Sequence, residues 1–193
     1  MYSPLVFIAL ATAVASLHMI APDHWLPLTA LSLKEGYKRR RVLEISTVLG
    51  FLHGSTSVLL SMLALFVGVS AFGLNDLKEV SIVVLVMVAI YVLANTLREK
   101  KGSKNIQSTS LIVSILPDPV LLPIIMASYP LGNVELTVIS VTFIVVSILA
   151  LLVVLGVVMT GVVKNLSKLK PTTVDYILVV ALFLTSIYIY FYG

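Results

Sequence analysis

Five side chains that can ionise lie inside segments of the chain that are otherwise strongly apolar. They are His18, Asp23, His24, His53 and Asp118, and the three histidines are the only ones in the sequence. Imidazole nitrogens suit nickel, cobalt, zinc, copper and iron, whereas magnesium and calcium prefer shells made of oxygen alone. These residue types therefore predict a binding site for a divalent transition metal, with the carboxylates of Asp23 and Asp118 offsetting its charge.

The composition places these residues in a membrane. The 193 residues are 59% hydrophobic and only 11% charged, with a mean hydropathy of +1.09, whereas a soluble domain carries about a quarter charged residues. Apolar runs near the length of about 20 residues that a spanning helix needs lie at residues 4–33, 42–71, 81–97, 107–130, 134–163 and 174–192. We predict an all-α polytopic membrane protein with six transmembrane helices, folded as one membrane domain over residues 1–193.

Ionisable residues at this depth are costly. Each one in the centre of a membrane helix costs about 2.5–3.5 kcal/mol, so such residues usually face the bundle interior and mark a pathway. The sequence has no cysteine, which excludes disulfides and thiol redox chemistry. It also has no G-x-x-x-x-G-K loop for ATP. We expect that the protein is not an enzyme. A transport function would have to be driven by an ion gradient, by the gradient of the metal itself or by a separate energising subunit.

A short motif occurs twice, as PDHWLP at residues 22–27 and PDPVLLP at residues 117–123. Proline removes a backbone donor and clashes with the preceding turn, so we expect the first and fourth helices to be broken here. Only a broken helix can aim His18, Asp23 and His24 at one point, because they would point in three directions on a continuous one. With three spans per half, the second half enters from the opposite face, which predicts two inverted repeats over residues 1–97 and 106–193.

The stretch from His18 to His24, HMIAPDH, resembles the H-x-x-x-x-D-H signature of the nickel/cobalt transporter family. It is especially similar to the H-x-x-x-P-D-H form of the short members identified as urease-accessory or nickel-permease-like proteins. Leu52-His53-Gly54 resembles, in changed order, the glycine-histidine pair that often follows on the next helix. The resemblance implies that His18, Asp23 and His24 recognise the metal.

The chain also resembles a wider superfamily, and it differs from the transporter family in two respects. The arrangement of two sets of three spans is similar to that of the lysine-exporter superfamily, to which the transporter family belongs. Ala21 stands where the family commonly has an acidic residue, and the chain lacks the histidine-rich loop that efflux members often carry. The resemblance therefore does not fix which metal is carried.

We predict a secondary transporter of nickel or cobalt, with zinc as a further candidate and no organic cofactor. His18, Asp23 and His24 would be the first ligands, and His53 and Asp118 would complete or gate the site. One alternative is a carrier of another small solute or an anion that uses the histidines and aspartates as a proton relay. Another is a non-transporting subunit of a membrane complex that binds haem through His18 and His53. The expected partners are the lipid bilayer and the metal, with a homo-oligomer or an energising subunit left open.

The basic residues predict the orientation in the cytoplasmic membrane. Twelve of the 13 follow the first, third and fifth spans, and Lys78 stands alone on the other side. The twelve are Lys34, Lys38, Arg39, Arg40, Arg41, Arg98, Lys100, Lys101, Lys104, Lys164, Lys168 and Lys170. Because Lys and Arg in short loops are retained in the cytoplasm, both termini are predicted to lie outside. The same rule explains the net charge of +4, so no nucleic-acid partner is expected.

This topology can be tested by single cysteines, because the natural chain contains none. Arg40→Cys should resist a membrane-impermeant thiol reagent in intact cells and react only after lysis. Lys78→Cys is the matched control and should react in intact cells. Labelling of Arg40→Cys without lysis would reverse the predicted orientation.

Overall fold

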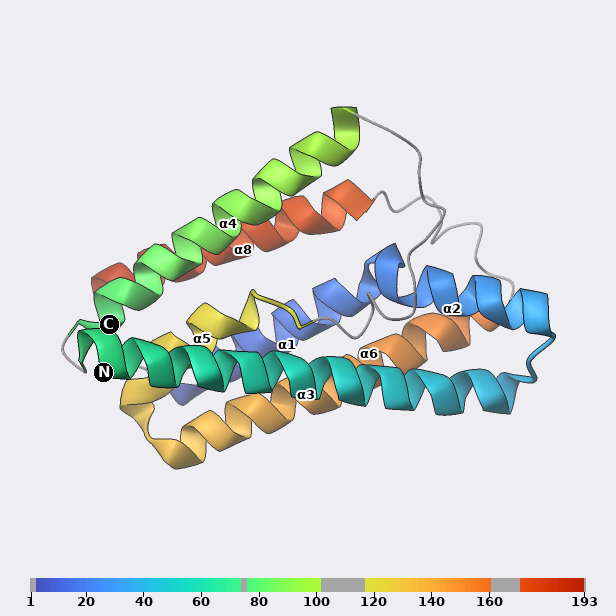
Figure 1. Ribbon diagram of the computed structural model, residues 1–193, viewed down its shortest axis with the longest axis horizontal. Coiled ribbons are helices and arrows are strands. Elements are labelled where there is room, and N and C mark those ends of the chain that lie inside the picture. Colours follow the sequence, from blue (N-terminus) through green and yellow to red (C-terminus); the bar gives the residue numbers. More distant parts are fainter. Residues whose placement is uncertain (1–2, 74–75, 102–116, 161–170, 193) are drawn as a thin grey trace.

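The computed structural model describes residues 3–73, 76–101, 117–160 and 171–192. Throughout these residues the chain is helical and contains no strand, which confirms the predicted all-α class. The helices are α1 (Pro4–Ile20), α2 (Pro22–Glu35), α3 (Arg39–Phe72), α4 (Leu77–Lys101), α5 (Leu121–Ser128), α6 (Asn133–Met159) and α8 (Pro171–Tyr192), with a short 3₁₀ helix η2 (Tyr129–Leu131) between α5 and α6. Figure 1 shows them lying roughly along one long axis.

Three helical segments are long and apolar enough to cross a membrane, which supports a membrane protein. They are Pro4–Glu35, which includes the junction of α1 with α2, Arg39–Ala71 and Asn133–Met159. Shorter apolar segments occur in α4, α5 with η2, and α8. The predicted fourth span begins at residue 107, and its part up to residue 116 lies outside the described residues.

The outer surface of α6 is apolar, whereas serine hydroxyls face the interior. The exposed stripe, with spacings of three and four residues, consists of Val134, Val138, Val141, Val145, Leu149, Val153 and Val157. Ser140 and Ser147 are buried on the same helix, and each hydroxyl donates to a carbonyl one turn back, at 2.8 Å. No more than 33% of the apolar window in each candidate span is buried inside the protein. This distribution is opposite to that of a soluble bundle and suits a lipid surround.

Two glycines let α3 approach α6 closely. A Cβ atom on Gly50 would lie 2.9 Å from the Cα of Ile148, and one on Gly54 would lie 2.9 Å from the Cα of Ile144. Four residues separate the glycines, which is the spacing by which small residues bring membrane helices together. His53 precedes Gly54, so the same contact sets how far its ring stands from α6.

Helices from the two halves of the chain lie side by side and run in opposite directions. This holds for α3 with α6 and for α4 with α8, and α1 also packs on α6 while α3 packs on α5 (Figure 1). The start of α1 and the end of α8 lie at the same end of the bundle (Figure 1). The junction of α2 with α3 lies at the opposite end (Figure 1).

The glycine contact predicts a difference between two alanine substitutions. Gly54→Ala should lower the free energy of unfolding by about 1–3 kcal/mol, because the new methyl meets backbone that cannot move aside. Gly156→Ala in α6 is the control, since nothing lies within 4 Å of its Cβ position, and it should be neutral or slightly stabilising. Thermal unfolding of the detergent-solubilised protein measures both. Equal stability of the two variants would contradict the close approach of α3 and α6.

Candidate metal centre

The helix is broken between His18 and His24, as the prolines predicted. Helix α1 ends at Ile20, Ala21 is extended (φ −60°, ψ 139°), and Pro22 opens α2. A residue that precedes proline is disfavoured in the helical region, which explains the break at Ala21. Pro27, in contrast, lies inside α2 without ending it.

The carbonyls freed by this break are used within the junction. The N–H of Ala21 donates to the carbonyl of His18 at 3.1 Å. The indole Nε1 of Trp25 donates to the carbonyl of Ile20 at 3.0 Å. Trp25 is the only tryptophan in the sequence, and it secures an opening in the helix that would otherwise leave a carbonyl without a partner away from water. Its role was not foreseen from the sequence, where only its position three residues after Pro22 hinted at it.

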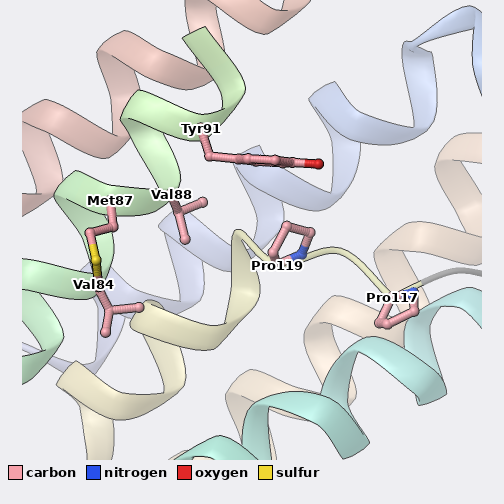
Figure 2. Close-up of a pocket in the computed structure, with 6 residues that line it drawn as sticks. All are labelled: Val84, Met87, Val88, Tyr91, Pro117 and Pro119. Carbon is pink, nitrogen blue, oxygen red and sulfur yellow. The ribbon is translucent and has the colours of Figure 1, made fainter. Parts of the chain in front are cut away.

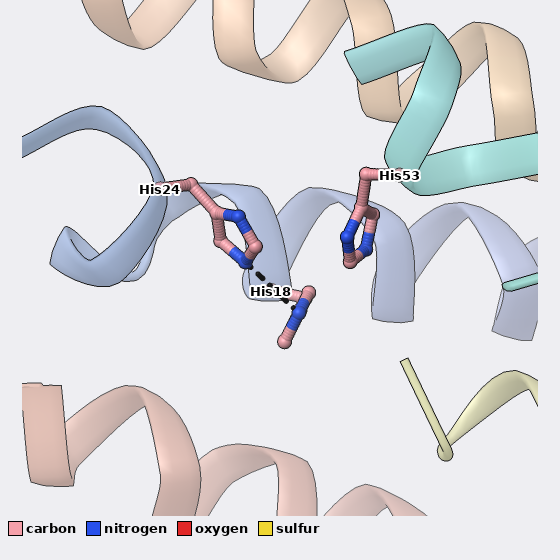
Figure 3. Close-up of side chains that lie close together, drawn as sticks. All are labelled: His18, His24 and His53. Atoms are coloured by element: carbon pink, nitrogen blue, oxygen red, sulfur yellow. Dashed lines mark hydrogen bonds between the residues drawn. The ribbon is translucent and has the colours of Figure 1, made fainter. Parts of the chain in front are cut away.

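The three imidazoles come together although they belong to three different helices. His18 lies in the last turn of α1, His24 in the first turn of α2 and His53 near the middle of α3. Their ring centroids are 4.6 Å apart for His18 and His24, 5.1 Å for His18 and His53, and 4.9 Å for His24 and His53 (Figure 3). The break at Ala21 makes this possible, because residues six positions apart on a continuous helix point in different directions.

The nitrogen atoms have spacings close to those around a single metal ion. The Nε2 atoms of His18 and His24 are 3.0 Å apart, and one potential ligand atom from each of the three rings lies within 4.8 Å of the others. Two nitrogens that each lie 2.0–2.1 Å from one ion are about 2.9 Å apart at a right angle and about 3.4 Å apart in a tetrahedron. His18 and His24 already meet this requirement, and a ring nitrogen of His53 lies within 4.8 Å of theirs.

The imidazoles differ in their access to the outside. His24 is 3% exposed and His53 is 1% exposed, whereas 21% of the His18 side chain remains accessible. Two apolar clusters border the site, one that includes Val14 and Ala15 of α1, and one that includes Met19 and Trp25. His18 is therefore the most accessible of the three rings, and His24 and His53 are enclosed.

Asp118 lies against the opposite edge of the His18 ring. Its Oδ2 is 3.8 Å from Nδ1 of His18, and the carboxylate is almost completely buried. Its Oδ1 accepts the N–H of Val120 at 2.9 Å, and its own N–H donates to the hydroxyl of Ser57 at 2.8 Å. Ser57 was not among the site residues predicted from the sequence. Its spacing of four residues after His53 was the signal that it faces the same site.

Four of the five predicted site residues are thus neighbours in the structure. His18, His24 and His53 share one cluster, and Asp118 contacts His18 from the other side. Asp23 lies in the first turn of α2, beside His24 in the chain, and its side chain lies outside what the structure describes. Whether its carboxylate approaches Asp118 or a metal stays a prediction.

A groove about 540 Å³ in volume runs between α4 and the segment that carries Asp118. It is lined by Val84, Met87, Val88 and Tyr91 of α4 and by Pro117 and Pro119, which flank Asp118 (Figure 2). The side chains of Met87 and Tyr91 are largely exposed. The groove gives the α4 side of the bundle an opening beside the backbone of the candidate site.

Comparison with known proteins identifies no family for this chain. No protein-family model, curated protein or solved structure matches it. The resemblance of residues 18–24 to the nickel/cobalt transporter signature therefore stays a prediction. What the site does has to be inferred from the chemistry of its own residues.

Proposed function

We propose that this protein is a secondary carrier that moves a divalent transition metal, nickel or cobalt in the first place and zinc in the second, across the cytoplasmic membrane. The single observation that supports this most is the cluster of three imidazoles from three helices, with ligand atoms within 4.8 Å of one another. Imidazole favours these metals over magnesium and calcium.

The setting of the cluster favours an ion over a purely structural role. Hydrogen bonding between two helices needs only two polar partners, and His18 and His24 already supply such a pair. A third ring from α3, at centroid distances of 4.9–5.1 Å, adds a further nitrogen ligand at the same position. The buried carboxylate of Asp118 supplies negative charge, which lowers the cost of holding a cation away from water.

The arrangement of helices supports two inverted repeats around this site. In such a repeat the broken pair α1–α2 corresponds to α5, α3 corresponds to α6, and α4 corresponds to α8. The contact of α1 with α6 is then equivalent to the contact of α3 with α5, and the contact of α1 with α8 is equivalent to the contact of α4 with α5. All four contacts occur. The equivalent helices α3 and α6, like α4 and α8, run in opposite directions (Figure 1). Pro22-Asp23 opens α2, and Pro117-Asp118 directly precedes the turn into α5. Transporters built in this way bind their substrate between broken helices near the membrane centre.

The depth of the site fits such a carrier. His53 is 14 residues from the start of α3 and 19 from its end, or about 21 Å and about 28 Å along the helix axis. The basic end of the bundle would face the cytoplasm. The metal would therefore bind far from either membrane surface, where access from the two sides can alternate.

A proton relay is the second candidate function, because a chain of contacts exists without a metal. The Nε2 atoms of His18 and His24 are 3.0 Å apart, and Asp118 lies 3.8 Å beyond Nδ1 of His18. The haem alternative finds no support, since the stacked rings of His18 and His53 have centroids 5.1 Å apart and leave no space for a porphyrin between them.

Metal binding predicts that the histidines act as one site. His18→Ala and His24→Ala should each weaken nickel and cobalt binding at least about 100-fold. Residues that only orient a metal ligand already contribute up to about 100-fold, and the loss of a ligand should cost at least as much. The double variant should cost little more than either single one, because ligands of one ion act together. Asp23→Asn should weaken binding and leave the fold intact. Calorimetric titration of the purified protein measures all four variants.

Two further measurements complete that titration. Thr29→Ala is the control, since this hydroxyl donates only to the carbonyl of Trp25 in the same helix, and it should bind as the wild type does. Affinity should fall from pH 8 to pH 5.5, because a metal and a proton compete for the same imidazole lone pair. A wild-type protein that binds neither nickel, cobalt nor zinc would leave the proton relay as the better interpretation.

Transport is a separate prediction from binding. Proteoliposomes that contain the wild-type protein and a metal-sensitive dye should take up nickel or cobalt, but not magnesium, faster than empty liposomes. His53→Ala should reduce the rate of uptake at least tenfold, because a loss of about 1.4 kcal/mol in binding free energy already lowers affinity tenfold. Thr29→Ala should leave the rate unchanged. Metal binding without any uptake by the wild type would make the chain a binding subunit instead of a carrier.

A further inference from the structure

Asp118 is held in place by two of its polar groups, and a third is left over. Its N–H is fixed by Ser57 of α3 and its Oδ1 by the N–H of Val120 at the start of α5. Its Oδ2 is buried and has no hydrogen-bond partner among the described residues, and it points to Nδ1 of His18, 3.8 Å away. The carboxylate therefore has a fixed position and one acceptor atom left for the imidazole.

We propose that Asp118 is a positioning residue for His18 and not a ligand of the metal. Oδ2 faces Nδ1 of His18 across 3.8 Å and favours the neutral ring with its proton on Nδ1, which leaves the lone pair of Nε2 turned toward His24. Carboxylates that accept the second N–H of a metal-bound histidine fix its tautomer and orientation and raise its basicity as a ligand. The proposal rests on the metal-carrier function and names how one ligand of that site is prepared.

The geometry separates this role from direct coordination. An ion between the Nε2 atoms of His18 and His24, which are 3.0 Å apart, lies beyond one edge of the His18 ring, whereas Asp118 lies beyond the other. A carboxylate ligand has to come within 2.0–2.2 Å of the metal. Reaching the ion would require the Asp118 carboxylate to give up its bond with the N–H of Val120 and pass around the ring.

The same contacts connect the two halves of the chain. Ser57 belongs to α3 and His18 to α1, in the first half, whereas Asp118 precedes α5 in the second. Ser57 also donates to the carbonyl of His53 at 2.8 Å. One serine hydroxyl thus links the turn that carries His53 to the residue that orients His18. A shift of α5 relative to α3 would disturb His18 through Asp118, which provides a direct route from helix movement to metal affinity.

The test uses Asp118→Asn and Ser57→Ala, with Ser61→Ala as the matched control. Ser61 is buried one turn farther along α3 and donates to the carbonyl of Ser57, but makes no hydrogen bond to Asp118 that would be lost. The first readout needs no metal: nitrogen-15 NMR of histidine-labelled protein distinguishes Nδ1–H from Nε2–H tautomers. His18 should be an Nδ1–H tautomer in the wild type and in Ser61→Ala, and should lose this preference in Asp118→Asn.

The second readout is cobalt binding followed by visible absorption. Asp118→Asn should weaken cobalt binding 10- to 100-fold, and Ser57→Ala should weaken it several-fold. Both should keep the band positions of the wild type, because the ligands around the ion are unchanged. Ser61→Ala should match the wild type in both respects.

Several outcomes would overturn the role of Asp118. One is an Nε2–H tautomer of His18 in the wild type, and another is wild-type cobalt affinity in both Asp118→Asn and Ser57→Ala. A shift of the cobalt bands in Asp118→Asn would identify Asp118 as a ligand and refute the proposal in a different way. A wild-type protein that binds no cobalt, nickel or zinc refutes the metal carrier itself, and the metal-free NMR result shows separately whether Asp118 orients His18.

Discussion

The candidate site depends on one backbone feature, the extended conformation of Ala21 between two helices. A continuous helix from Pro4 to Glu35 would carry His18 and His24 on different faces, and no side-chain rotation would then bring their Nε2 atoms to 3.0 Å. Pro22 prevents the continuous helix because it has no N–H and restricts the residue before it. The break itself is stabilised by Trp25, whose indole satisfies the carbonyl of Ile20.

The second requirement is that α3 comes close enough to complete the cluster. Helix α3 is also held close to α6, where Gly50 and Gly54 meet the backbone of Ile148 and Ile144. Small residues at this spacing replace the hydrophobic driving force that helices lack in lipid, because close contact is what holds them together there. Polar side chains turn inward and valines outward for the same reason, so the bundle places its few ionisable groups in one enclosed position.

Much of this could be predicted from the sequence, because the signals act locally. Apolar runs indicated the membrane helices, the proline pairs indicated where the first helix breaks, and the depth of His18, His24 and His53 indicated a shared site. What could not be predicted depends on which helices become neighbours. The hydrogen bond between Ser57 and Asp118 joins residues 61 positions apart, and the alternatives for Asp118, ligand or positioning residue, differ only in which edge of the His18 ring it faces.

The charges around the site bear on how a carrier can release what it binds. Three imidazoles would provide nitrogen ligands without an excess of negative charge, and the buried carboxylate that the structure describes lies behind His18 instead of among these nitrogen atoms. A site with several carboxylates around the ion would hold it more strongly and make release from a buried position slower. Placing the negative charge one ring away keeps the cation stabilised while the affinity depends on the orientation of His18. If Asp118 at the head of α5 controls that orientation, as we propose, a modest movement between the two halves would be enough to change how tightly a metal is held.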